Sequence, residues 1–124
     1  MKEWEVEYTD EFGEWWTTLN ENDQEAITFS VGLLRQHGPS LKYPHSSGVW
    51  QSRHSHMREL RSQSEGEPIR TFYAFDPQRA AILLIGGKKT GDDRFYEAMV
   101  PKADKIYDKH LIEIQAERGG TDNG

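Results

Sequence analysis

Eleven residues in the middle and later part of this 124-residue chain have side chains that could bind and cleave a phosphodiester. They are Arg53, His54, Arg58, Glu59, Arg61, Arg70, Tyr73, Lys88, Lys89, Arg94 and Tyr96. Cleavage of RNA without a metal needs a group that orients or deprotonates the 2′-hydroxyl, cations for the phosphate, and an acid for the leaving oxygen. Arginine suits the phosphate because its planar fork matches two oxygens and stays charged. Tyrosine and histidine can stack on an unpaired base or move protons.

The spacing of these residues predicts that several of them share one face of a sheet. On an expected strand over residues 57–62, alternation places Glu59 and Arg61 on one face and Leu60 on the other. Arg70 lies on the next expected strand, and Lys88-Lys89 follow the third, where side chains leave the core. An ordinary sheet face with paired arginine and glutamate side chains would have the same composition.

The distribution of charge supports a local anion site in an acidic protein. The net charge of −6 argues, by itself, against nucleic-acid binding. However, residues 1–41 carry −7, residues 42–90 carry +4 and residues 91–124 carry −3. The local field decides where a phosphate binds, so the basic middle third remains a candidate, with chance segregation of surface charge as the alternative.

Two further patterns are weaker. His54 and His56 have the spacing of metal ligands on a strand, and His37 and His45 are nearby, but no acidic residue lies at a tight spacing beside them. Histidines of a surface loop are therefore expected, and no metal. The segment Gly86–Gly91 (GGKKTG) lacks the spacing of a nucleotide-binding phosphate loop, although its lysines could contact an anion.

The N-terminal third predicts a strand and two helices. Residues 3–8 alternate, with Trp4, Val6 and Tyr8 on one face. Thr9 is the expected N-cap of a first helix, and Asn22 with Glu25 resembles a capping box for a second, which Gly38-Pro39 ends. The inward stripe expected for the second helix includes Ile27, Phe29, Val31, Leu33 and Leu34.

The rest of the chain predicts a loop over residues 40–56, an antiparallel meander and a final helix. The strands are expected at residues 57–62, 69–75 and 80–86, the last covered on both faces. Asp92-Asp93 can start a helix that Pro101 restarts or kinks. The prediction is one α+β domain over residues 1–118, ordered β-α-α-β-β-β-α with a twisted, mainly antiparallel sheet, and a disordered tail over 119–124.

The N-terminus has no apolar run typical of a secretory signal, and the longest apolar stretch, residues 80–87, is too short to span a bilayer. There is no cysteine, so disulfides and thiolate metal sites are excluded. We therefore expect a cytoplasmic protein without membrane association.

Five segments, in this order, resemble the HigB-like (phage-derived Gp49-like) branch of the RelE/ParE toxin superfamily. They are MRELR at residues 57–61, IRTFYAFDP at 69–77, AILLIGGKKT at 81–90, DDRFY at 92–96 and ADKIY at 103–107, with a weaker likeness in YTDEF at 8–12. The resemblance implies a small RelE-like, microbial-RNase-like fold. It also implies a toxin of a type II toxin–antitoxin system that enters the ribosomal A site and cuts mRNA through 2′-hydroxyl attack, as a metal-independent endoribonuclease without cofactor.

The implied partner is a helix-turn-helix (HigA-like) antitoxin. The protein would bind operator DNA only through this antitoxin. By this resemblance the catalytic candidates are His54, Arg61, Arg70, Lys88, Lys89 and Tyr96, and the composition adds Glu59 as a candidate general base. The RNA-binding candidates, from the same basic and aromatic composition, are Arg53, Arg58, Tyr73 and Arg94. Two alternatives remain at this stage. One is a ParE-like inhibitor of DNA gyrase, and the other is an inactive toxin that acts only through its antitoxin complex.

Overall fold

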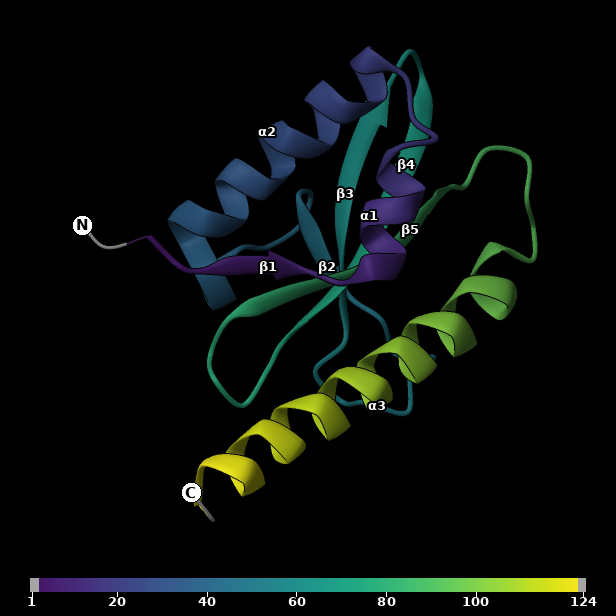
Figure 1. Ribbon diagram of the computed structural model, residues 1–124. Helices are drawn as coiled ribbons and strands as arrows, with labels where there is room; N and C mark the ends of the chain where they lie inside the picture. The colour runs from purple at the N-terminus through teal and green to yellow at the C-terminus, as the bar shows by residue number, and fades with distance from the viewer. Residues whose placement is uncertain (1–2, 123–124) are drawn as a thin grey trace.

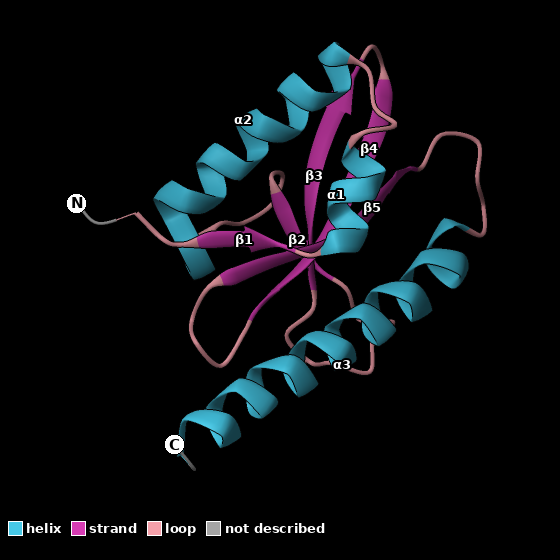
Figure 2. Ribbon diagram, in the orientation of Figure 1, coloured by secondary structure: helices cyan, strands magenta, loops and turns pink. Residues whose placement is uncertain are grey.

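The computed structural model describes residues 3–122, with side chains described up to residue 117. A five-stranded sheet in the order β1-β5-β4-β3-β2 forms the centre of the protein (Figures 1 and 2). β1 pairs with β5 in parallel and the other three pairs are antiparallel. The predicted α+β class with a mainly antiparallel sheet is confirmed. The strands are β1 (Val6–Tyr8), β2 (Ser46–Gly48), β3 (Arg58–Ser64), β4 (Glu67–Phe75) and β5 (Ala81–Lys88).

Helices α1 (Asp10–Trp16) and α2 (Glu21–His37) follow the first strand, as the amphipathic stripes predict. Thr9 caps α1, because its hydroxyl accepts a 3.1 Å hydrogen bond from the Phe12 backbone N–H. The cap of α2 is Asn20, whose side chain accepts from the Asp23 N–H at 2.8 Å, so the prediction of a capping box at Asn22 was wrong. The helix begins at Glu21, two residues before Asp23, where an N-cap at Asn22 would have started it.

Strand β3 turns into β4 through two residues, Glu65 and Gly66, whose φ angles of 52° and 80° are both positive. Such a turn matches the twist of the flanking strands, so the ladder begins immediately on either side of it. Both strands are therefore longer than predicted, and Gln63 pairs with Pro68 inside the ladder.

Strand β2 lies within residues 40–56, where only a loop was expected. It pairs with β3 through Ser46–Leu60, Ser47–Glu59 and Gly48–Arg58. A three-residue edge strand of serine and glycine has no apolar alternation, so its pairing could not be recognised from the sequence pattern.

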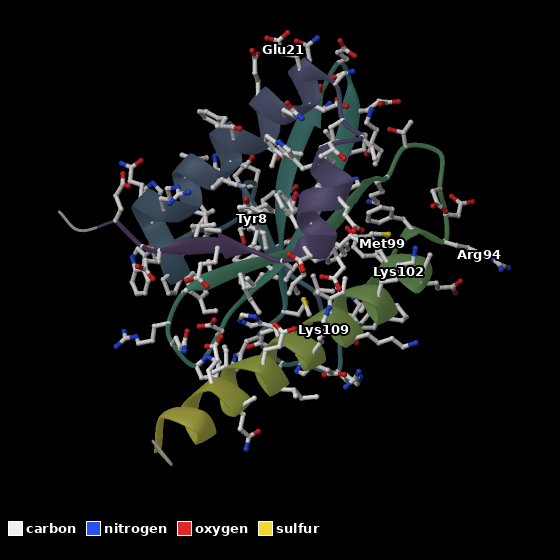
Figure 3. All side chains as sticks on the ribbon, viewed as in Figure 1. Tyr8, Glu21, Arg94, Met99, Lys102 and Lys109 are labelled. Carbon is white, nitrogen blue, oxygen red and sulfur yellow. The ribbon has the colours of Figure 1, made fainter. Side chains whose placement is uncertain are left out.

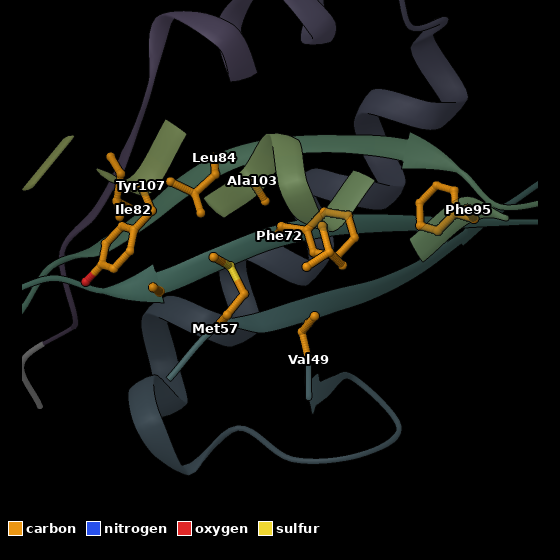
Figure 4. Close-up of a cluster of buried hydrophobic side chains, with 10 residues drawn as sticks. Val49, Met57, Phe72, Ile82, Leu84, Phe95, Ala103 and Tyr107 are labelled. Carbon is orange, nitrogen blue, oxygen red and sulfur yellow. The ribbon is translucent and has the colours of Figure 1, made fainter. Parts of the chain in front are cut away.

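Two apolar layers hold the helices against opposite faces of the sheet. Helices α1 and α2 cover one face through residues that include Ile27, Leu34, Leu60 and Leu83. Helix α3 covers the other through residues shown in Figure 4, among them Phe72, Leu84, Phe95, Ala103 and Tyr107. Strand β5 is covered on both faces, as predicted from its apolar sequence.

Two aromatic residues expected in the core are instead exposed. Tyr8 is 67% exposed on β1 and Phe29 is 66% exposed on α2. The neighbouring Ile27 and Ser30 are buried, so the inward stripe of α2 is narrower than its apolar composition indicated.

The 3-10 turn η1 (Gly38–Ser40) follows α2, and the final helix α3 spans Phe95–Asp122 without a restart at Pro101. Proline has no backbone N–H, so one carbonyl in the preceding turn of the helix lacks its usual hydrogen bond. Pro101 is exposed, so this carbonyl can accept a hydrogen bond from water instead. The helix also includes residues 119–122 of the expected disordered tail, and residues 123–124 lie outside the described residues.

Candidate active site

Glu59 lies at the centre of a group of polar side chains on the α3 face of the sheet. Its Oε1 accepts a 2.7 Å hydrogen bond from the Tyr96 hydroxyl, and its Oε2 accepts one of 2.8 Å from the Ser47 hydroxyl. The Nη1 of Arg61 lies 3.3 Å from Oε2 and the Nε of Arg70 lies 4.0 Å from Oε1. The Glu59 side chain is only 5% exposed, so these partners replace much of its solvation. We call these five residues the Glu59 cluster.

The ladder between β3 and β4 brings the two arginines together. Glu59 and Arg61 are two residues apart on β3 and share a face, while Leu60 packs in the core on the opposite face. Arg61 stands directly opposite Arg70 in the register. Because like charges at such a position repel, the carboxylate of Glu59 offsets the repulsion.

Arg70 retains hydrogen-bonding capacity that its contacts do not use. Its Nη1 donates to the backbone carbonyls of Ile69 at 3.2 Å and Ser62 at 3.5 Å. Its buried Nε has no hydrogen-bond partner among the described residues. A buried donor without an acceptor costs about 1–3 kcal/mol, so an anion that reached Arg70 would relieve this deficit.

Tyr96 comes from the first turn of α3 and closes the cluster from above the sheet. Burial raises the pKa of its hydroxyl, and the hydrogen bond and the negative charge of Glu59 raise it further, whereas Arg70 acts in the opposite direction. Tyr96 therefore stays protonated at neutral pH and serves as a donor, not as a base.

Two cation–aromatic contacts border the cluster. The Nζ of Lys89 lies 5.4 Å from the centroid of the Tyr96 ring. The Cζ of Arg61 lies 5.0 Å from the centroid of the Tyr43 ring, which is 71% exposed. The two arginines of the cluster and the neighbouring Lys89 thus place three cationic side chains near one carboxylate, with the exposed Tyr43 ring beside them.

Lys88 lies on the other face of the sheet, so the prediction that both lysines belong to one site was wrong. Its Nζ is 2.9 Å from Asp23 Oδ2 and 3.4 Å from Glu67 Oε2. Strand β5 continues to Lys88, so alternation turns Lys88 toward α2 and Lys89 toward Tyr96. Lys88 joins α2 to the sheet.

His54 and Arg53 lie against the middle of α3 and make no contact with Glu59. The Nε2 of His54 is 2.7 Å from Asp108 Oδ1, and the Arg53 guanidinium pairs with both oxygens of the same carboxylate. Asp108 follows Tyr96 by twelve residues, or about 18 Å along the helix axis. These contacts fix the loop before β3 to α3, so the sequence-based placement of His54 beside Glu59 was wrong, whereas Arg53 lines a groove that Tyr96 also lines.

Three more predicted RNA contacts lie outside the cluster. Tyr73 is fully buried, and its hydroxyl is 2.6 Å from Ser46 Oγ on the α2 face. Arg58 donates to the same Ser46 oxygen at 3.0 Å. Arg94 extends away from the protein (Figure 3), and its Nε is 3.9 Å from Glu97.

Sequence reasoning missed Ser47 and Tyr43, which contact Glu59 and Arg61. Both belong to the segment expected to be a loop. The only available signal was their position between the second helix and the strand that carries Glu59, which is too weak to place them.

Among the described residues, no three histidine, aspartate or glutamate side chains form a group that could hold a metal ion. Within residues 3–122, no helix combines the length and the apolar character needed to cross a membrane.

The sequence of the chain is similar to phage-derived Gp49-like proteins (DUF891) over residues 14–108. HigB3 of Mycobacterium tuberculosis, named as a toxin, is 38% identical over 107 residues, which cover 86% of this chain and 90% of that protein. HigB2 of the same organism, also named as a toxin, is 34% identical over 103 residues. That match covers 82% of this chain and 51% of HigB2, so the chain spans about half the length of this relative.

Two solved structures have a similar fold. A mutant of the E. coli toxin RelE in the free state has a TM-score of 0.56 at 12% identity, covering 80% of this chain and 96% of RelE. The archaeal RelE–RelB complex from Pyrococcus horikoshii gives 0.52 at 9% identity, covering 71% of this chain and 97% of the matched chain. At these identities the likeness shows a RelE-like fold and no more.

Proposed function

The chain belongs to the phage-derived Gp49-like family, within the HigB-like branch of the RelE toxins, and we propose that it is a metal-independent endoribonuclease that cleaves mRNA. The proposed active site is the Glu59 cluster together with Lys89. One observation carries this proposal: Glu59 and Tyr96 are in hydrogen-bond contact beside two arginines. A carboxylate, a protonated phenol and phosphate-binding cations are the groups that RNA transesterification needs.

In the proposed reaction, Arg61 and Arg70 bind the scissile phosphate and stabilise the negative charge that develops on it. Glu59 accepts the proton of the 2′-hydroxyl, and the 2′-oxygen attacks phosphorus. The bond from phosphorus to the 5′-oxygen breaks, which leaves a 2′,3′-cyclic phosphate and a 5′-hydroxyl. Tyr96 donates a proton to the departing 5′-oxygen.

The hydrogen bond between Tyr96 and Glu59 must then open when RNA binds. In the free protein the Tyr96 hydroxyl donates a 2.7 Å hydrogen bond to the Glu59 carboxylate. The 2′-hydroxyl of the substrate would take the place of Tyr96 at Glu59, which frees the phenol for the leaving oxygen. Lys89, beside the Tyr96 ring, adds positive charge where the RNA backbone would pass.

We further propose that the substrate is mRNA in the ribosomal A site, in the cytoplasm, and that a helix-turn-helix (HigA-like) antitoxin inhibits the protein. Operator DNA would be bound only through that antitoxin. The proposal follows from the relatives named as HigB toxins. The archaeal RelE–RelB complex is a further example of the RelE fold bound to a second protein.

The test is a reaction of the purified protein with mRNA bound to ribosomes, in Mg²⁺ buffer, and with free mRNA, with and without EDTA. We expect fragments with 2′,3′-cyclic phosphate and 5′-hydroxyl ends, formed faster on ribosomes, and we expect the cleavage of free mRNA to be unaffected by EDTA. Intact mRNA in both reactions, together with inhibition of purified DNA gyrase, would instead identify a ParE-like activity.

A further inference from the structure

A small pocket of about 310 Å³ lies between α2 and the outer edge of β3. Its lining residues are Ala26, Phe29, Ser30, His45, Arg61, Ser62 and Gln63. The floor is fixed, because the hydroxyls of Ser30 and Ser62 are hydrogen-bonded at 2.7 Å inside the protein. The volume is at the lower end of the range typical of small-ligand sites.

Arg61 connects this pocket to the Glu59 cluster. Its guanidinium contacts Glu59 at 3.3 Å, and the same residue lines the pocket. A nucleotide whose phosphate is bound by Arg61 therefore has its neighbouring atoms next to the pocket.

Phe29 supplies an aromatic wall that the fold does not use. Its side chain is 66% exposed, and no ring contact to it is found among the described residues. His45 adds a second ring, and its backbone carbonyl accepts a 2.8 Å hydrogen bond from the Arg61 N–H. Unpaired bases stack on rings of this kind.

The edge of β3 supplies polar groups to the same pocket. Strand β2 begins at Ser46, which pairs with Leu60, and among the described residues no strand pairs with Gln63 on this edge of β3. Gln63 faces Pro68, which has no N–H and whose carbonyl accepts from Lys89 on the other side. The alternation of an antiparallel ladder therefore turns the N–H and C=O of Gln63 outward, toward the pocket. A donor and an acceptor side by side can pair with the edge of a base.

The charge of the lining favours this pocket over a larger groove elsewhere. The groove that Trp50 and Tyr96 share is lined by three carboxylates (Asp93, Glu97 and Asp104) and two cations (Arg53 and Lys105), so its lining carries a net charge of −1. The pocket beside Phe29 has Arg61 and no carboxylate. The net charge of the second lining therefore favours an RNA chain more than that of the first.

We propose that this pocket binds one unpaired nucleobase of the RNA whose phosphate lies in the Glu59 cluster. The base stacks on Phe29, and its edge is hydrogen-bonded by the backbone of Gln63. This inference rests on the proposed function and names a specificity site for it.

The test compares the wild type with Phe29→Ala and with a matched control, Ile112→Ala. Ile112 is 67% exposed on α3 and lines none of the pockets described above. Cleavage rates are measured on free and on ribosome-bound mRNA, intact or with a single abasic nucleotide at each position around the cut. Circular dichroism checks that all three proteins are folded.

We expect Phe29→Ala to slow cleavage of intact RNA by about 5- to 100-fold, the usual range for loss of one stacked base. One abasic position should slow the wild type and Ile112→Ala by a similar factor, and should slow Phe29→Ala no further. If Phe29→Ala cleaved at the wild-type rate, or if an abasic nucleotide slowed Phe29→Ala as much as it slows the wild type, the proposed base-binding role of the pocket would be overturned. The proposed endonuclease activity would still stand. Wild-type protein that cuts neither RNA would overturn the proposed function and this inference together.

Discussion

The hydroxyl of Tyr96 donates a 2.7 Å hydrogen bond to Oε1 of Glu59, across 37 positions of sequence. The bond joins the first turn of α3 to strand β3. Phe95, the preceding residue, is buried against the same face, so apolar packing holds the helix where this contact forms. The core of the protein thus positions the two groups to which we assign the proton transfers.

Glu59→Gln is expected to lower the rate of mRNA cleavage by about 10²- to 10⁴-fold, the usual contribution of a general base. The amide keeps the shape of the side chain and can still accept from Tyr96. Rates of purified protein on ribosome-bound mRNA, with thermal unfolding measured in parallel, check this expectation.

Ser47→Ala is the control for that variant, because it removes a hydrogen bond to the same carboxylate and leaves the base in place. We expect a decrease of at most about tenfold, since one such bond contributes about 0.5–1.5 kcal/mol. Equal losses in Ser47→Ala and Glu59→Gln would argue that Glu59 only supports the structure.

The pKa of Tyr96 is expected to respond to its neighbours in opposite directions. Burial and then Glu59 raise it above the ordinary value of 10.0, so Glu59→Gln should lower it and Arg70→Lys should leave it raised. Because the folded state holds this proton more tightly, Tyr96 contributes stability that declines as pH rises above about 10. Ultraviolet titration of the phenol, with Tyr96→Phe as the blank, measures the shift. An unchanged pKa in Glu59→Gln would contradict the assigned contact.

Lys88→Met is expected to destabilise the protein without removing a catalytic group. Burial raises the pKa of Asp23, but hydrogen bonds from Lys88 and Ser64 and the charge of Lys88 lower it below its ordinary value overall. In the wild type this stabilisation is present above the unfolded pKa of about 3.8 and is lost as pH falls through the folded pKa. Without Lys88, the charged carboxylate of buried Asp23 lowers the free energy of unfolding at neutral pH, and protonation of Asp23 at acidic pH reduces this loss.

Thermal unfolding at neutral pH and near pH 4 therefore tests the role of Lys88. The difference between the wild type and Lys88→Met should become smaller at the acidic pH. The cleavage rate per folded molecule should stay within about threefold of wild type. If folded Lys88→Met protein cleaved mRNA a hundredfold more slowly than the wild type, Lys88 would have to be assigned to the active site.

His54→Ala and Arg94→Ala are expected to cleave mRNA within about threefold of the wild-type rate. His54 contacts Asp108 and the Tyr107 ring, and Arg94 contacts Glu97, all outside the Glu59 cluster. Interactions absent from the transition state do not change its free energy. Rates measured under the conditions used for Glu59→Gln give the comparison, and a loss above a hundredfold in His54→Ala would place that histidine in the chemistry.

The sequence predicted the fold well where side chains alternate or repeat along a regular element. The two N-terminal helices, the meander and the face shared by Glu59 and Arg61 all follow from local periodicity. The pairing of β1 with β5 joins segments about 75 residues apart, and no local pattern could show it.

The site was harder to predict because the register of the strands and the positions at which they end determine which side chains face one another. Two extra residues at the end of β5 decide that Lys89 and not Lys88 faces Tyr96. His54 was expected beside the arginines from the family resemblance, but Asp108, in the middle of α3, holds it away from them. Ser47 is in the site only because β2 pairs with β3 through backbone groups.

The most direct test of the central claim is a map of mRNA 5′ ends in bacteria that express the wild type or Arg70→Lys. The lysine keeps the charge and loses the planar fork that binds two phosphate oxygens. The account predicts new 5′ ends within coding regions for the wild type, and their loss or strong reduction in the variant at equal protein level. Growth arrest with intact mRNA, or the same cuts at the same frequency in Arg70→Lys, would contradict it.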